Sequence, residues 1–153
     1  PGDEGYDSNT PHGLIVSLTN IGSTNPQWGC SGTSIPGTLE TIGSGHDNTT
    51  LIIDNCSQNL IAAKSCSDYT SMGFDDWYLG SSQEMLQLGI NIQIVNNSLT
   101  GIENSQLVNN QFLTSTESNA IQALRIIAGG NQSYTFGTNK NTNQIPTRPI
   151  RSF

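Results

Sequence analysis

The segment GFDDWYLGSSQEM, residues 73–85, constrains the fold more than any other part of the chain. It holds Ser81 and Glu84 at the spacing of a capping box. In that motif the serine hydroxyl accepts a backbone N–H three residues on, and the glutamate carboxylate accepts the N–H of the serine. The pattern predicts a helix that continues through Met85 and Leu88. We therefore expect Glu84 to have a structural role rather than a catalytic one.

The two acidic residues before this helix fit a scaffold better than a catalytic centre. Trp77 and Leu79 alternate with polar neighbours, as in a short strand that leads into the helix. Asp75 and Asp76 then point to opposite sides of an extended chain, so they are badly placed as a cooperating acid and base. No Asp-x-Asp-x-Asp calcium loop is present. We expect at least one of the two to accept turn amides or to pair with an arginine.

The remaining hydrophobic pattern predicts short elements joined by long loops. Strands are expected from Leu14, at Ile90 to Val95, at Phe112 to Ser115, at Ala123 to Ala128 and at Tyr134 to Phe136, with a turn at 129–131 before the last. Helices are expected after a cap at Asp47 or Asn48, and at 60–69. Residues 21–45 and 96–110 are expected to be loops, the first anchored by Trp28. The fold class is thus α+β, with short antiparallel strands and two or three helices.

Composition and an N-terminal pattern suggest one domain behind a stalk. The chain has 153 residues, and only 11% of them are charged, with Asn, Ser, Thr and Gly filling the gap. The chain has no run of about 18 apolar residues, which is the length that a membrane-spanning helix needs. The opening PGDEGYD places Gly2 and Gly5 three apart, which is the register of a collagen repeat. We expect residues 1–8 to end a collagen-like stalk or a linker, and residues 9–153 to form a single binding domain.

Three cysteines, Cys30, Cys56 and Cys66, allow three different single disulfides, each of which leaves one thiol. We favour Cys56–Cys66 because these two are closest in sequence. A metal site is a poorer interpretation, because no CxxC occurs and His12 and His46 are far apart in sequence. We expect no metal and no cofactor.

The charges are segregated along the chain. Residues 1–117 hold all twelve acids and a single base, Lys64, whereas residues 118–153 hold four bases and no acid, within a net charge of -7. Such asymmetry predicts either an anionic partner for a basic face or pairing of the basic segment with the acidic body. The sequence pattern leaves both open.

Several segments in order resemble one family of bacterial surface domains. They are GLIVSL (13–18), QWGCSGTSIPGT (27–38), GSGHDNTTLII (43–53), AAKSC (62–66), GFDDWYLGSSQEM (73–85), FLTSTES (112–118) and RPIRSF (148–153). Together they are similar to the DUF1566, or Lcl C-terminal-like, family. Gly80 departs from the family pattern, which has proline there.

The resemblance implies a C-type-lectin-like fold of the formylglycine-generating-enzyme type. It also implies an extracellular or bacterial cell-surface adhesin that is trimeric through a collagen-like stalk and binds sulphated host glycosaminoglycans, with neither nucleic acid nor membrane insertion involved. Arg148 and Arg151 match the closing motif, so their first expected role is to pair with Asp75, Asp76 or Glu117. Arg125 and Lys140 lie outside the motifs.

We expect ligand contacts from Arg125 and Lys140 first, and from Arg148 and Arg151 as part of the same basic face. One alternative is a calcium-dependent lectin for neutral sugars, and another is a trimerisation cap for the stalk without its own ligand. An enzyme is the third alternative, with His12 or with His46 and Asp47 as acid and base, or Cys30 as nucleophile. No HExxH, phosphate loop or supported Ser-His-Asp set is present, so we expect no enzyme.

Overall fold

The computed structural model describes residues 12–153 except 22–25, 103–104, 106, 108–110 and 130–131. The stalk expected at residues 1–8 therefore lies outside the described residues, as does part of the turn expected at 129–131. None of the helices in the described part is long and apolar enough to cross a membrane.

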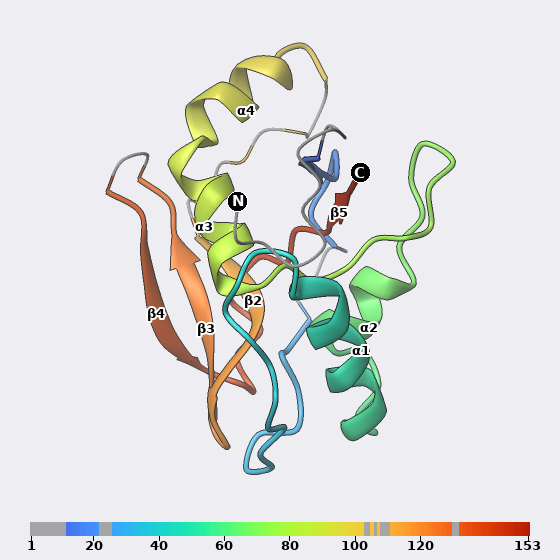
Figure 1. The fold of residues 1–153 in the computed structure, drawn as a ribbon, viewed down its shortest axis with the longest axis vertical. Helices are drawn as coiled ribbons and strands as arrows, with labels where there is room; N and C mark the ends of the chain where they lie inside the picture. The colour runs from blue at the N-terminus through green and yellow to red at the C-terminus, as the bar shows by residue number, and fades with distance from the viewer. Residues whose placement is uncertain (1–11, 22–25, 103–104, 106, 108–110, 130–131) are drawn as a thin grey trace.

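The described residues form a mixed α+β fold with antiparallel sheets (Figure 1), as the sequence pattern predicts. The elements in chain order are β1 (Leu14–Val16), α1 (Gly45–Asn55), α2 (Ala62–Ser67), α3 (Ser82–Ile90), α4 (Ile92–Ser98), β2 (Gln111–Asn119), β3 (Gln122–Ile127), β4 (Tyr134–Asn139) and β5 (Ile150–Ser152). One sheet has the order β2-β3-β4 and the other pairs β1 with β5. Within the described ranges there are four helices, where the sequence predicts two or three.

The three-stranded sheet packs against a different hydrophobic cluster on each face. Phe112 and Ile126 are cross-strand partners, so their side chains share one face. That face meets α3, where Met85 and Leu88 join the same cluster. On the other face, Leu113 and Ala123 pack in the cluster built around Trp28. The indole Nε1 of Trp28 donates to the Thr114 carbonyl at 3.0 Å, which confirms Trp28 as the anchor of its loop.

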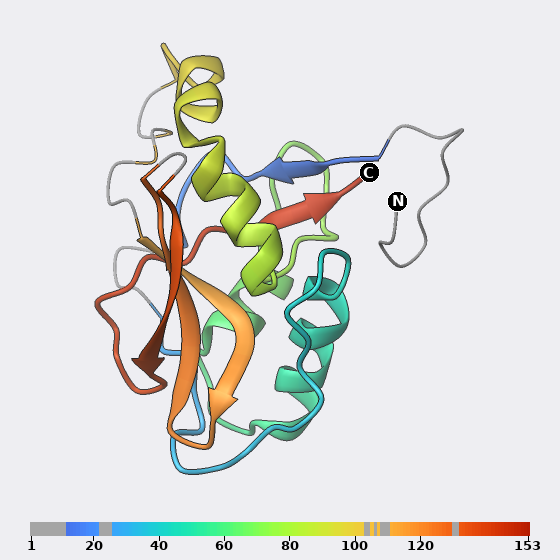
Figure 2. The ribbon, with the colours of Figure 1, turned by 60° about the vertical axis from the view of Figure 1, so that its left-hand side comes forward.

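The second sheet pairs an early strand of the chain with its last strand. β1 pairs with β5 in the register Leu14 to Ser152 and Val16 to Ile150. Ile150 also exchanges two backbone hydrogen bonds with Tyr78, of 2.9 and 3.1 Å. The expected strand around Trp77 and Leu79 is thus reduced to a single bridge. Figure 2 shows this small sheet crossing beside α3 and α4.

The capping box is confirmed. The Ser81 hydroxyl accepts the Glu84 N–H at 3.3 Å, and the Glu84 carboxylate accepts the Ser81 N–H at 2.7 Å. The same carboxylate accepts the Gly43 N–H at 3.0 Å. Glu84 is therefore an interior side chain that ties the start of α3 to the loop before α1.

The strand expected at Ile90 to Val95 is wrong. The segment forms the end of α3 and the start of α4, because backbone bonds from Asn91 to the Gln87 carbonyl and from Val95 to the Asn91 carbonyl continue the helical pattern. A helix satisfies its backbone groups within its own segment, whereas a strand there would need a neighbour. Alternating isoleucines indicate a strand only where one face of that strand is buried. No residue of α4 is buried, so the alternation could not decide between helix and strand.

Two expectations about α1 and the cysteines are also wrong. The helix begins after Ser44, and Asn48 lies inside it, bonded to both the N–H and the carbonyl of Leu39. The disulfide joins Cys30 to Cys56 and leaves Cys66 free and buried. Cys66 lies on α2 in the buried cluster around Trp28, and Cys56, which belongs to the same cluster, is bonded to Cys30 instead.

Candidate ligand-binding surface

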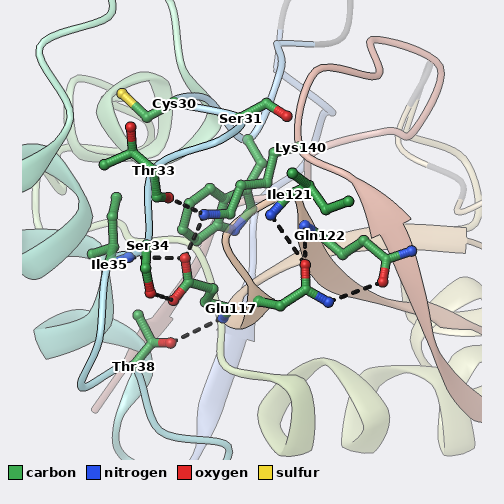
Figure 3. A network of polar contacts seen from close by, with 12 residues as sticks. Cys30, Ser31, Thr33, Ser34, Ile35, Thr38, Glu117, Ile121, Gln122 and Lys140 are labelled. Carbon is green, nitrogen blue, oxygen red and sulfur yellow. Dashed lines mark hydrogen bonds and ion pairs between the residues drawn. The ribbon is translucent and has the colours of Figure 1, made fainter.

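Lys140 is interior rather than at the surface. Its side chain is fully buried at the end of β4, where the ammonium forms an ion pair with Glu117, donates to the Thr33 carbonyl at 2.9 Å and lies 4.4 Å from the centre of the Trp28 ring (Figure 3). Glu117 also accepts the Ile35 N–H at 2.8 Å. The pair therefore fastens the loop after the disulfide onto the sheet, and Lys140 cannot touch a ligand in this conformation.

Arg148 is interior as well, but it has no carboxylate partner among the described residues. Its guanidinium donates to the carbonyls of Leu18 and Ser105 at 2.9 and 2.6 Å, and to Asn20 at 3.3 Å. Its Nε is buried without a hydrogen bond. Burial lowers the pKa of Arg148 to about 10 because the charged form loses hydration. The expected pairing of Arg148 with Asp75, Asp76 or Glu117 is not formed; the arginine instead ties three chain segments together.

Arg151 does form the expected ion pair, with Asp76. Two hydrogen bonds of 2.6 and 2.7 Å join the guanidinium to both carboxylate oxygens, and the guanidinium carbon lies 4.1 Å from the centre of the Phe74 ring. The Arg151 hydrogen bond lowers the pKa of Asp76 below its ordinary value. Because its charge is matched in this way, Arg151 offers little free positive charge to a ligand.

Arg125 differs from the other bases. It lies in the middle of β3, is partly exposed, and makes no ion pair among the described residues; its Nη1 donates to the Gln111 side chain at 2.7 Å. The remaining base, Lys64, is paired with Asp68 on α2. Within the described part of the chain, Arg125 is thus a partly exposed base that is unmatched by an acid, and its Nε is buried without a hydrogen bond.

Two exposed aromatic rings share the face of Arg125. Arg125 is the cross-strand partner of Phe136, and Ile127 is the partner of Tyr134, so these side chains lie on the same side of the sheet. Tyr134 and Phe136 are 55% and 47% exposed, with ring centroids 6.4 Å apart. We call Arg125, Gln111, Tyr134 and Phe136 the β3–β4 patch. It lies on the same face as Leu113 and Ala123 but beyond the part covered by the core.

The groups considered for catalysis do not converge. Cys30 is in the disulfide, so the interpretation of Cys30 as a nucleophile is wrong. His46 Nδ1 and Asp47 Oδ1 are 3.5 Å apart, but both side chains are largely exposed on α1. Over the ranges that the structure describes, no three His, Cys, Asp or Glu side chains gather as they would around a metal ion.

Charge singles out Arg125 in the sequence, but no sequence pattern singles out the two aromatic residues beside it. The YTF segment predicts only a strand. Its alternation places Tyr134 and Phe136 on one face, yet nothing in the sequence tells which face is left open. The cross-strand register supplies that information.

Comparison of the chain with known protein families finds no family that matches, and comparison with curated proteins finds no match either.

Proposed function

We propose that this domain is an extracellular, adhesin-type binding module with a C-type-lectin-like fold, and that it binds sulphated polysaccharide at the β3–β4 patch. The observation that carries the proposal is Arg125, the accessible base without an acid partner in the described chain, beside two exposed aromatic rings. A planar guanidinium fork suits a sulphate group with several oxygens. Exposed aromatic faces suit the C–H-rich side of a sugar ring.

The patch replaces the broad basic face expected from the sequence. Lys140 and Arg148 are buried, and Arg151 is matched by Asp76. One arginine per chain can still contact a polyanion on a protein of net charge -7, because charges farther away than about 8 Å are screened at physiological salt. A single such contact is weak. Three patches on a trimer with a collagen-like stalk would provide the strength through avidity.

The disulfide supports a location outside the cytoplasm. Cys30 and Cys56 are paired in a chain with few charges and many turn residues. Disulfides of this kind persist in oxidising compartments. We therefore propose that the protein is secreted to the bacterial surface, where sulphated host polysaccharides would be its partners.

The test is binding to immobilised heparin over a salt series, with Arg125→Gln compared with Lys64→Gln. Lys64 is a matched control, because it is an exposed base on α2 that is not part of the patch. We expect wild-type affinity to fall steeply with salt and Arg125→Gln to lose roughly ten-fold, as for one charged contact. Lys64→Gln should bind like the wild type. Phe136→Ala should also weaken binding, but without changing the slope against salt.

The alternatives give different results in the same assay. Calcium-dependent binding to a neutral sugar, insensitive to salt, would favour the conventional lectin. Absence of binding to sulphated and neutral polysaccharides alike would favour a trimerisation cap without its own ligand. Either result contradicts the β3–β4 patch as a polyanion site.

A further inference from the structure

The outer edge of β1 carries backbone groups that no described residue pairs. β1 has β5 on one side and no other described strand on the opposite side (Figure 2). Gly13 and Phe153 exchange two backbone hydrogen bonds, each of 3.2 Å. In an antiparallel pair such exchanges fall on alternate residues, so the N–H and C=O groups of Leu14 and Val16 point away from β5. These groups form an open edge of the sheet.

This edge lacks the features with which proteins block strand pairing. Free edges are protected by charged side chains, by proline or by a bulge, whereas residues 13–17 read GLIVS and pair with β5 in a regular register. Leu14 and Ile15 are each 37% exposed. The edge is therefore able to accept another strand and can be reached from solvent.

An apolar groove lies between this edge and helix α3. It has a volume of about 350 Å³, with β1 on one side and residues of α3 and α4 on the other. Val16 and Ile150 are cross-strand partners and both line the groove, so the face of the small sheet that carries Leu14 and Val16 is turned toward it. Glu84 is the one ionisable residue of the lining, and backbone amides already hold its carboxylate. The groove thus offers apolar contact beside an open strand edge.

The occupant that these two features fit is an extended peptide segment of another protein. A strand added antiparallel to β1 lies about 4.8 Å away, and its backbone groups can pair with those of Leu14 and Val16. The peptide residues opposite Leu14 and Val16 share their face, so their side chains enter the groove. Because β1 is only three residues long, backbone bonds alone hold such a peptide weakly. Apolar side chains packed against Leu88 and Val95 supply the additional contact.

We propose that β1 binds an extended peptide by antiparallel strand addition, with alternate apolar side chains of the peptide in the groove and basic residues at its ends. The basic residues follow from the net charge of -7, which attracts a cationic segment and repels an acidic one. The same charge makes a second copy of this chain a poorer occupant. The site is separate from the β3–β4 patch, and it does not depend on the proposed binding of polysaccharide.

The test is an NMR titration of the isotope-labelled chain with the synthetic peptide Lys-Thr-Val-Thr-Val-Thr-Lys, blocked at both ends. We expect saturable shifts of the amide signals of β1 and of the groove. With the valines in the groove, the valine N–H groups face β1 and the threonine N–H groups point away. Methylation of the valine nitrogens should therefore weaken binding roughly ten-fold, whereas methylation of the threonine nitrogens should leave the affinity unchanged.

Leu14→Pro and Leu14→Ala form a matched pair of variants of the chain. Both remove the leucine side chain, but only proline also removes the N–H at the open edge, and proline is tolerated on edge strands. Leu14→Pro should bind the peptide roughly ten-fold more weakly than Leu14→Ala. Unchanged amide signals of β5 show that each variant is folded. Arg125→Gln, which alters the other surface, should bind the peptide like the wild type.

Three outcomes would overturn the proposal. The first is the absence of saturable shifts when the peptide reaches millimolar concentration. The second is an equal loss of affinity for both methylated peptides, which would indicate apolar adsorption without strand pairing. The third is a dimer of the chain that excludes the peptide, which would make a second copy the occupant of the edge. Binding that is weakened by the methylated valines and by Leu14→Pro, and by neither matched control, supports strand addition at β1.

Discussion

Lys140 and Arg125 lie in the same acid-free segment, yet the fold uses them in opposite ways. Lys140 is fully buried against Trp28 and paired with Glu117, whereas Arg125 is partly exposed and bonded only to a neutral side chain, Gln111, among the described residues. The difference follows from the strands. Arg125 is central in β3, on the part of the sheet face that the core does not reach, and Lys140 follows β4 where the loop after the disulfide closes over it.

The comparison shows that a basic stretch of sequence need not be a basic surface. Of the four bases after residue 117, two are interior and one is matched by Asp76. The pairing of the basic segment with the acidic body, one of the two possibilities left open by the charge pattern, accounts for Lys140 and Arg151. Arg125 has no acid partner among the described residues, which is why we propose it as the ligand contact.

The largest expected effect comes from removing Lys140, which is the partner of Glu117. Lys140→Met leaves the Glu117 carboxylate buried without its counter-charge, which should lower the free energy of unfolding by about 3–5 kcal/mol. Denaturant titration measures it. The double variant Lys140→Met/Glu117→Gln should recover part of the loss, because the amide oxygen can still accept the Ile35 N–H.

The matched control for this prediction is Lys64→Met. Lys64 and Asp68 are an exposed pair one turn apart on α2, and such pairs contribute about 0–1 kcal/mol. A similar loss of stability in Lys64→Met and Lys140→Met would contradict the distinction between interior and surface charges.

Arg148 should show a smaller effect because it has no counter-charge to abandon. Arg148→Met leaves the carbonyls of Leu18 and Ser105 without their donor, at a cost of about 1–3 kcal/mol. The charge itself is removed, so the burial penalty that lowers its pKa is relieved. Urea unfolding of the variant measures the balance, and a variant more stable than the wild type would show that the burial penalty is the larger of the two.

The next smaller loss of stability is expected from the capping box. Ser81→Ala removes the oxygen that accepts the Glu84 N–H and should cost about 1 kcal/mol. Ser82→Ala is the control, since Ser82 is the first residue of α3 and not its cap. Heparin binding per folded molecule should stay the same in both. Binding lost in Ser81→Ala at an unchanged melting temperature would show that this region is more than scaffold.

Local patterns predicted the parts of the fold that local contacts decide. The capping box at Ser81 and the strands that became β2, β3 and β4 follow from short-range spacing and hydrophobicity. The strand expected at Ile90 to Val95 failed because its alternation carried no information about whether a partner strand existed. The predicted cysteine pairing was wrong because distance along the chain does not report distance in space: Cys30 is 26 residues from Cys56 in sequence, yet their Cα atoms are 5.8 Å apart.

The candidate site was predictable only in part, because it depends on contacts between residues that are distant in sequence. Arg125 could be named from charge alone, but its accessibility depends on the register of β2, β3 and β4, which also brings Tyr134 and Phe136 to its side. The burial of Lys140 depends on a loop more than a hundred residues earlier in the chain, at Thr33. No spacing rule reports a contact of that range.

The smallest expected effect concerns the surface pair of Asp76 and Arg151. The guanidinium lowers the pKa of Asp76, so the folded carboxyl binds its proton less readily than the unfolded one. The pair therefore adds stability at pH above the ordinary aspartate value near 3.8, and this contribution disappears as the pH falls through the lower folded value.

Titration of Asp76 by NMR should give a pKa below 3.8 in the wild type and a higher value in Arg151→Ala. An Asp76 pKa that does not change when Arg151 is removed would show that the two charges are not coupled in solution. In that case Arg151 would join Arg125 as a base available to a polyanion, and the contrast between paired and free bases would need to be redrawn.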